Sequence, residues 1–306
     1  MNITIIGLGQ VGLCWAEALS ATHTVSVSDP HPPAIARTWS ESTGIPIRPE
    51  VSEWIGGQDL VLMCVPGSVL PLLSGPLACH VSAGATVVDM TTAAAQAKRE
   101  AAALIEASNV GYLDVAITGA VALSGVRTPL LCAGKRNTSV EEMFLNVGAP
   151  FRLLPDSTPG DAVTVKLLRS VIMKGLEALA IEALPAARSY GVLDHLYAVL
   201  QDVDQAPFTS LLESMVATHP DHAVRRRAEV IEAAGQLSRA GYPAALTEHV
   251  AEKFSTTVDT VSRLGAPTSS TFEASMAWLE ITAKGATDQA EAEDTSGPSL
   301  RLTQHS

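Results

Sequence analysis

The sequence predicts an α/β fold with a doubly wound, mainly parallel sheet, followed by an all-α domain. Three observations support this prediction. Short apolar runs alternate with helical patterns over the first half of the chain, which is typical of a parallel sheet covered by helices on both faces. A glycine-rich turn directly follows the first apolar run. After Pro159-Gly160 the pattern becomes helical throughout, with no further strand-like run up to about residue 282.

The elements of the first half are predicted in order from these patterns. The first strand covers 3–6, a helix begins near residue 10, and a second strand covers 24–28. Further strands are predicted over 59–65, 85–90, 111–117, 129–133 and 151–154, and further helices over 69–80, 93–107 and 139–147.

The second half begins with a long helix, predicted from Asp161 to about Arg188. It is apolar on nearly all sides, so we expect it to be buried between domains or subunits, and we expect Pro185 to kink it near its end. The predicted domains are therefore 1–158 and 159–283. Residues 284–306 have little apolar content and no period, which predicts a mobile tail.

The glycine-rich turn predicts a dinucleotide site of the Rossmann type. A strand precedes it and a helix follows, so the first glycine permits the tight turn, the second lets the backbone approach a pyrophosphate, and the third lets the helix pack on the strand. This predicted cofactor-binding segment is Gly7-Leu8-Gly9-Gln10-Val11-Gly12.

The second predicted strand ends in Asp29, close to the offset of about 20 residues at which an acidic residue binds the adenosine ribose. A carboxylate there repels a 2′-phosphate, and no Arg or Lys stands beside it in the segment 28–31. The sequence therefore favours NAD as the cofactor, with NADP as the alternative.

Composition and charge narrow the class of protein. The formal net charge of −12 over 306 residues argues against binding to nucleic acid or to an anionic membrane. No apolar run approaches the about 18 residues of a membrane span, and no signal peptide precedes the first strand, so we expect a cytoplasmic protein. The four cysteines are widely spaced, which predicts neither disulfides nor a zinc site.

Two patterns indicate where chemistry takes place. The long helix carries one polar stripe, and the strand over 111–117 is followed by Thr118, Gly119 and Ala120, whose hydroxyl and backbone N–H groups form a pattern typical of a carboxylate cradle. The alternative for the stripe is a solvated edge in which Lys174 pairs with Glu177. The stripe consists of Lys166, Arg169, Ser170, Lys174 and Glu177.

Taken together, these motifs resemble the β-hydroxyacid dehydrogenases, a family that includes 3-hydroxyisobutyrate and 6-phosphogluconate dehydrogenases. The resemblance covers about residues 1–190, and the segment from there to about 239 resembles the helical C-terminal domain of a phosphogluconate-dehydrogenase-like subgroup. It is carried by the fingerprint glycines, Cys64-Val65-Pro66, the segment 88–92, Thr118-Gly119-Ala120, and Lys166 in a helix after Gly160.

The resemblance implies roles for particular positions. Lys166 matches the catalytic lysine of the family, and Thr118-Gly119-Ala120 matches its Ser-Gly-Gly carboxylate cradle. Cys64, Val65, Pro66 and Thr92 match positions near the nicotinamide. Arg169 stands where most members have Asn, which adds charge and bulk at the substrate. A homodimer and an acidic small-molecule substrate are also implied.

The chemistry follows from the lysine. An alcohol loses its hydroxyl proton as hydride leaves for the nicotinamide, and a lysine can accept that proton only if its pKa is lowered. Burial, with Arg169 and Lys174 as like charges, predicts such a shift for Lys166. Arg169 is the candidate for gripping a substrate carboxylate or phosphate, with Lys174 beside it.

The predicted function is reversible NAD-dependent oxidation of a small hydroxy acid with Lys166 as general acid and base. Two alternatives stay open, an imine reductase and a non-catalytic NAD-binding interaction module. His219 and His222 lack a third liganding group nearby, so no metal is predicted. Arg225-Arg226-Arg227 is predicted to be a solvated face, with a substrate or subunit contact as the alternative.

Overall fold

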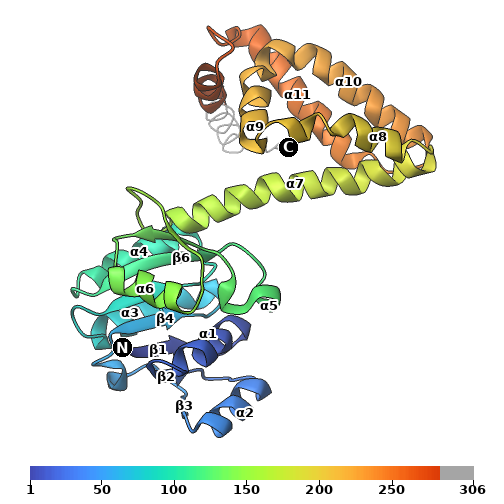
Figure 1. Ribbon diagram of the computed structural model, residues 1–306. Helices are drawn as coiled ribbons and strands as arrows, with labels where there is room; N and C mark the ends of the chain where they lie inside the picture. Colours follow the sequence, from blue (N-terminus) through green and yellow to red (C-terminus); the bar gives the residue numbers. More distant parts are fainter. Residues whose placement is uncertain (283–306) are drawn as a thin grey trace, which may run out of the picture. The chain divides into compact units, whose positions relative to one another are not determined.

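The computed structural model describes residues 1–282, so the tail predicted over 284–306 lies outside the described residues (Figure 1). The chain divides into two compact units, Met1–Ile172 and a second unit that begins at Met173. Each unit is described separately below. The domain boundaries predicted near residues 158 and 283 stay a prediction.

The first unit is built on one eight-stranded sheet in the order β3-β2-β1-β4-β5-β6-β7-β8 (Figure 1). All neighbouring strands are parallel except the antiparallel pair β6 and β7. The chain starts in the middle of the sheet and winds outward in both directions, which confirms the predicted doubly wound fold. The strands are β1 (Asn2–Ile6), β2 (Thr24–Ser28), β3 (Ile47–Arg48), β4 (Leu60–Met63), β5 (Thr86–Asp89), β6 (Gly111–Ile117), β7 (Leu130–Gly134) and β8 (Phe151–Leu153).

Helices cover both faces of this sheet. Apolar residues of α1, α2 and α6 pack into one hydrophobic core, where Trp15 of α1 meets Phe144 of α6 edge to face at 5.1 Å. Those of α3 and α4 pack into a second core on the other face. The helices are α1 (Gln10–Ser20), α2 (Ala34–Thr43), α3 (Leu70–His80), α4 (Ala95–Glu106), α5 (Val121–Ser124) and α6 (Thr138–Asn146), with 3-10 turns at Glu53–Ile55, Gly67–Val69 and Gly125–Arg127.

Three elements of this unit were not predicted from the sequence, and two of them are short. Strand β3 has two residues and α5 has four, so neither is long enough to show a period. Helix α2 begins after Pro33, and its apolar positions are few, with only Ala36 and Trp39 buried. The predicted strands and helices are all present, with ends that differ by at most two residues.

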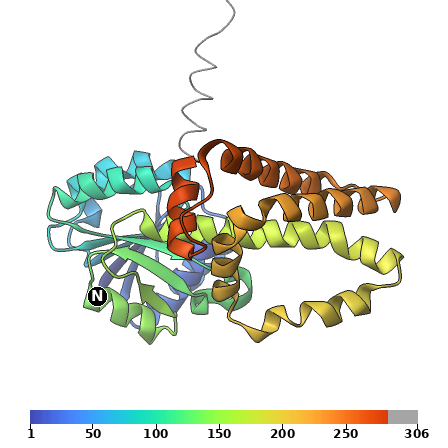
Figure 2. The same ribbon diagram turned by 90° about the horizontal axis from the view of Figure 1, so that it is seen from above.

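The second unit is all-α over its described residues. Helices α10 and α11 lie side by side, as both views show (Figure 1, Figure 2). Glu182 of α7 (Asp161–Ser189) accepts hydrogen bonds from the backbone N–H groups of Leu246 and Thr247 at 3.1 and 2.9 Å, which caps the start of α11. The other labelled helices are α8 (Leu193–Leu200), α9 (Phe208–Ala217), α10 (His219–Arg239) and α11 (Ala245–Leu264), with a 3-10 turn at Val203–Gln205, and residues 272–282 are also helical.

Helix α7 matches the predicted long helix in extent but not in burial. Ala162 and Val163 at its start are buried, whereas the side chains of Leu168 and Val171 are 61% and 70% exposed in the single chain. The expected burial of α7 is therefore not provided by this chain alone. Its apolar side chains extend around the helix, and most of them contact no other part of the chain that would bury them. The helix continues through Pro185 to Ser189. None of the helices within residues 1–282 is both long and apolar enough to cross a membrane.

Candidate active site

The glycine-rich turn between β1 and α1 has the geometry that a dinucleotide needs. Gly7 has a φ of +88° and its N–H donates to the Ser28 carbonyl at 2.8 Å. A Cβ on Gly12 would lie 1.8 Å from the Gly7 carbonyl oxygen, so only glycine allows α1 to pack this closely. By contrast, a Cβ on Gly9 would meet nothing within 4 Å. The open space at Gly9, at the N-terminus of α1, fits a cofactor pyrophosphate.

Asp29, at the end of β2, is tied to this turn. Its Oδ2 accepts the N–H of Leu8 at 2.7 Å, and its Oδ1 accepts the N–H of His31 at 2.8 Å. Each carboxylate oxygen keeps a second lone pair. Asp29 therefore positions the glycine-rich turn, a task that the sequence analysis did not assign to it, and its predicted contact with the adenosine ribose stays a prediction.

A pocket of about 530 Å³ opens beside the glycine-rich turn, within the range typical of ligand sites. Ten of the residues predicted for the site line it, together with Met90, Ile117, Val121 and Ala122. The ten are Gly9, Gln10, Val11, Cys64, Val65, Pro66, Thr92, Gly119, Ala120 and Lys166.

The structure thus brings Lys166 to the same pocket as the glycine-rich turn. Its side chain is half-buried, on the second turn of α7. Burial lowers the pKa of the Lys166 ammonium, the positive charge of Lys98 lowers it further, and the negative charge of Asp114 acts in the opposite direction. A lysine with a lowered pKa at a cofactor pocket can serve as an acid or a base.

The like charge that acts on Lys166 differs from the predicted one. This role was predicted for Arg169 and Lys174, whereas the like charge that lowers the pKa of Lys166 in the structure is that of Lys98 on α4. Arg169 is exposed, and Lys174 forms an ion pair with Glu177 on the solvated edge that was considered as the alternative. Helical spacing shows which residues share a face, but it does not show what another element brings to that face.

The predicted carboxylate cradle lies partly at the pocket. The backbone of Gly119 and Ala120 borders it. The hydroxyl of Thr118 donates to the Pro129 carbonyl at 3.0 Å, as the Thr118 N–H does at 2.9 Å, which ties this end of β6 to β7. Their roles toward a substrate stay predictions.

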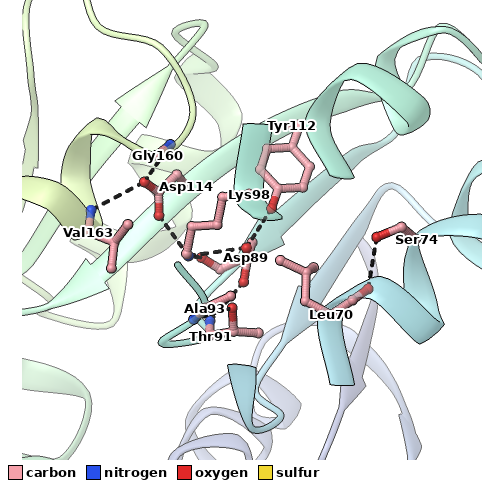
Figure 3. A network of polar contacts seen from close by, with 10 residues as sticks. All are labelled: Leu70, Ser74, Asp89, Thr91, Ala93, Lys98, Tyr112, Asp114, Gly160 and Val163. Carbon is pink, nitrogen blue, oxygen red and sulfur yellow. Dashed lines mark hydrogen bonds and ion pairs between the residues drawn. The ribbon is translucent and has the colours of Figure 1, made fainter. Parts of the chain in front are cut away.

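A buried polar network that was not predicted from the sequence is formed by four residues outside the pocket lining, Asp89, Lys98, Tyr112 and Asp114 (Figure 3). A signal for it exists in the sequence. Lys98 falls on the apolar stripe of α4, three, four and seven residues before Ala101, Ala102 and Ile105, which places its side chain toward the core. A lysine at such a position needs a buried anionic partner.

The histidine pair of α10 has a structural environment. His219 lies within hydrogen-bond distance of the Thr257 hydroxyl, 2.8 Å away, and burial lowers the pKa of its imidazole. Of the three neighbouring arginines, Arg225 pairs with Glu229, and Arg226 donates to the Thr218 hydroxyl. Over residues 1–282, no three His, Cys, Asp or Glu side chains come together as a metal site would require.

Comparison with known proteins supports the nucleotide-binding assignment. A family described as the NAD-binding domain of 6-phosphogluconate dehydrogenase matches residues 2–154, and a family described as a domain of unknown function matches residues 187–257. A curated relative, an uncharacterized oxidoreductase from Shewanella frigidimarina, is 36% identical over 124 residues, which is 39% of this chain and 42% of that protein. The chain matches less than half the length of the curated relatives.

Solved structures share the fold. An imine reductase from Aspergillus terreus in complex with NADPH4 is 22% identical, with a TM-score of 0.68 and coverage of 84% of this chain and 93% of that chain. An imine reductase variant from Myxococcus stipitatus in complex with NAD+ is 15% identical, with a TM-score of 0.68 and coverage of 91% and 99%.

The family match covers half of the chain and includes every element that forms the glycine-rich turn and its sheet. The open space at Gly9 and the close packing at Gly12 fit the cofactor that the family binds. The chain therefore belongs to the family of proteins that carry the NAD-binding domain of 6-phosphogluconate dehydrogenase.

Proposed function

We propose that this protein catalyses the reversible, NAD-dependent oxidation of a small hydroxy acid, with Lys166 as the general acid and base. The observation that carries the proposal is the position of Lys166. It is the one charged side chain among the described residues that line the pocket at the glycine-rich turn. When bound, the nicotinamide takes up a hydride from the substrate carbon or returns it.

The residues of the chain divide the remaining work. The glycine-rich turn and the N-terminus of α1 bind the pyrophosphate, while Val65, Pro66 and Thr92 border the nicotinamide end of the pocket. In oxidation, the neutral amine of Lys166 accepts the substrate hydroxyl proton at Nζ. In reduction, the Lys166 ammonium returns that proton to the developing alkoxide oxygen.

The pKa of Lys166 sets a pH dependence. Only the neutral amine can act as a base, so the oxidation rate rises as the pH increases through this pKa, and the reduction rate falls. Because burial and the charge of Lys98 lower the pKa, we expect both changes below the range of an ordinary lysine. A rate profile for oxidation that stays flat between pH 6 and pH 11 would remove Lys166 from the mechanism.

The carboxylate of the substrate has two candidate contacts. The backbone of Gly119 and Ala120 borders the pocket, and Arg169 lies three residues after Lys166 on α7, on a neighbouring position of the same face. A guanidinium binds a carboxylate through two hydrogen bonds. Arg169→Ala should therefore raise the KM for the acid at least tenfold, equivalent to about 1.4 kcal/mol, with a smaller effect on kcat. An unchanged KM would exclude this contact.

The experiment that tests the proposal follows nicotinamide absorbance during incubation with 2- and 3-hydroxy acids, using NAD or NADP. Lys166→Met should bind NAD normally but lose most turnover. Lys253→Met is the matched control, because this exposed lysine lies on α11 and should leave turnover unchanged. Turnover that survives in Lys166→Met would disprove the assignment of the base.

Imine reduction is the second candidate, because solved imine reductases share this fold. The same assay with cyclic imines and NADH or NADPH distinguishes the two reactions. Reduction of an imine without turnover of any hydroxy acid would favour this candidate. Tight NADH binding without turnover of an acid, aldehyde or imine would favour the third hypothesis, a non-catalytic interaction module.

We also propose a homodimer, in which a second copy covers the exposed apolar side chains of α7. Analytical ultracentrifugation of the full chain tests this arrangement. Val171→Glu should shift the protein toward a monomer, whereas Val224→Glu, which adds the same charge at an equally exposed position of α10, should not. A wild-type protein that sediments as a monomer at micromolar concentration would contradict the proposal.

A further inference from the structure

Lys98 of α4 is a completely buried cation. Its Nζ lies 3.1 Å from Oδ2 of Asp89 and 2.8 Å from Oδ1 of Asp114, and it also donates to the Asp89 carbonyl at 3.3 Å (Figure 3). All three side chains are 0% exposed. Charges in a protein interior are costly unless they are paired and hydrogen-bonded, so this ammonium depends on both carboxylates.

Asp114 of β6 uses its other oxygen on α7. Its Oδ2 accepts the N–H groups of Gly160 and Val163 at 3.0 and 3.3 Å, at the first turn of that helix (Figure 3). The close approach is built into the backbone, since a Cβ on Gly160 would lie 2.8 Å from the carbonyl oxygen of Ala95 on α4. The start of α7 is thus held against both β6 and α4.

Lys166 lies one turn beyond Val163 on the same helix, so whatever holds the first turn of α7 also holds Lys166 at the pocket. The other carboxylate points elsewhere. Asp89 accepts the hydroxyl of Tyr112 and the N–H of Thr91, and so holds the loop that leads to Thr92 at the pocket. Lys98 therefore connects Asp114, which holds the first turn of α7, with Asp89, which holds the loop before Thr92.

We propose that Lys98 and Asp114 are positioning residues for Lys166, in which Asp114 holds the first turn of α7 and Lys98 holds Asp114 in place. The proposal rests on the function proposed above, because it explains how Lys166 is positioned to act as the acid and base. It adds a positioning role to two residues that do not line the pocket.

The charges around Lys166 support this role. The positive charge of Lys98, on α4, lowers the pKa of Lys166, and the negative charge of Asp114, on β6, raises it. On α7 itself, Asp161 lies near the helix start, 3.6 Å from Arg99, with both side chains partly exposed. The Cys64 thiol that borders the pocket stays neutral, because burial raises its pKa. The buried cation and the buried anion therefore shift the pKa of Lys166 in opposite directions, and each can be removed separately.

The test measures the ionisation of Lys166 without any substrate. Trace acetic anhydride labels amines only in their neutral form, so the extent of Lys166 acetylation, read by mass spectrometry as a function of pH, reports its labelling midpoint. Removing the cation in Lys98→Met should raise this midpoint, and removing the anion in Asp114→Asn should lower it, each by at least roughly half a pH unit.

Tyr112→Phe is the matched control. It removes the hydrogen bond to Asp89 but touches neither α7 nor the charges, so it should lower stability without moving the midpoint. A merely structural network would give shifts of the same sign, or no shifts, in all three variants. That result would overturn the proposal.

Loss of one buried partner can prevent folding. The double variant Lys98→Met/Asp89→Asn therefore removes the cation together with the carboxylate that does not contact α7, which leaves the net charge of the network unchanged. It should raise the midpoint as Lys98→Met does, and an unmoved midpoint in the folded double variant would overturn the proposal. Failure of the proposed function is seen separately, as turnover that persists in Lys166→Met, because labelling requires no turnover.

Discussion

The glycines of the nucleotide-binding turn provide a sharp prediction, because two neighbouring members of one motif should respond to alanine in opposite ways. In Gly12→Ala the new methyl carbon would begin 1.8 Å from the Gly7 carbonyl oxygen, where ordinary contacts start at about 3.4 Å. Both groups belong to the main chain or lie directly on it, so β1 and α1 must move apart. We expect a loss of about 3 kcal/mol or more, at the upper end of overpacking costs.

Gly9→Ala should leave stability nearly unchanged. The methyl carbon meets nothing within 4 Å, and the backbone of Gly9, with φ of −65° and ψ of −169°, is accessible to alanine. The same methyl group occupies the space predicted for the pyrophosphate. We therefore expect NAD affinity to fall at least tenfold, equivalent to about 1.4 kcal/mol.

Thermal unfolding and calorimetric titration with NAD separate these outcomes. For a unit of this size, 3 kcal/mol corresponds to a decrease in Tm of roughly 6–12 °C in Gly12→Ala, compared with a change of about 2 °C or less in Gly9→Ala. A Gly9→Ala variant that binds NAD with wild-type affinity would refute the placement of the pyrophosphate. A Gly12→Ala variant with wild-type Tm would refute the packing argument.

Three further predictions follow from single contacts. Asp29→Ala removes the acceptor of the Leu8 N–H and the charge that repels a 2′-phosphate. Titration calorimetry should therefore show a loss of about 1–3 kcal/mol in the binding free energy of NAD and a smaller loss for NADP. Equal losses for the two cofactors would contradict the predicted preference for NAD. Glu182→Ala removes the cap of α11 and should cost about 1–2 kcal/mol in denaturant unfolding, with Glu182→Gln as the milder control. Burial acts to raise the Glu182 pKa but its hydrogen bonds to Thr247 and Leu246 lower it overall, so this contribution is present above the unfolded-state pKa and should disappear as the pH falls through the folded-state pKa. Trp15→Ala should cost about 3–5 kcal/mol, because Trp15 is 2% exposed and packs on Phe144, and a cost below 1 kcal/mol would show that the site collapses around the cavity.

Much of the first unit could be predicted from the sequence because its signals are local. Strand β4 is a continuous apolar run, and α1 follows a glycine pattern in which each of the three glycines has a separate steric reason. The short elements β3 and α5 could not be predicted, because two or four residues carry no period. The antiparallel direction of β7 depends on the connection through α5, which gave no signal either.

The candidate site was predicted in part for the same reason. The glycine-rich turn is recognisable from its own residues, Lys166 was indicated by the family resemblance of the ordered motifs, and the structure brings both to one pocket. Arg169 and Lys174 were chosen by helical spacing, yet the charge that acts on Lys166 comes from Lys98 on another element. Spacing along one helix contains no information about the element that packs against it.

The sequence by itself determined the fold class, the order of the elements and the cofactor motif, because each depends on residues within a few positions of one another. The order of the motifs along the chain indicated the candidate base. Only the tertiary structure decided which charges meet. Asp114 accepts the N–H of Gly160 across 46 positions of the chain, and Lys98 reaches Asp89 and Asp114 because α4 packs where β5 and β6 lie side by side. Contacts of that kind depend on the order of strands in the sheet and on the packing of helices over it, and no local pattern records either.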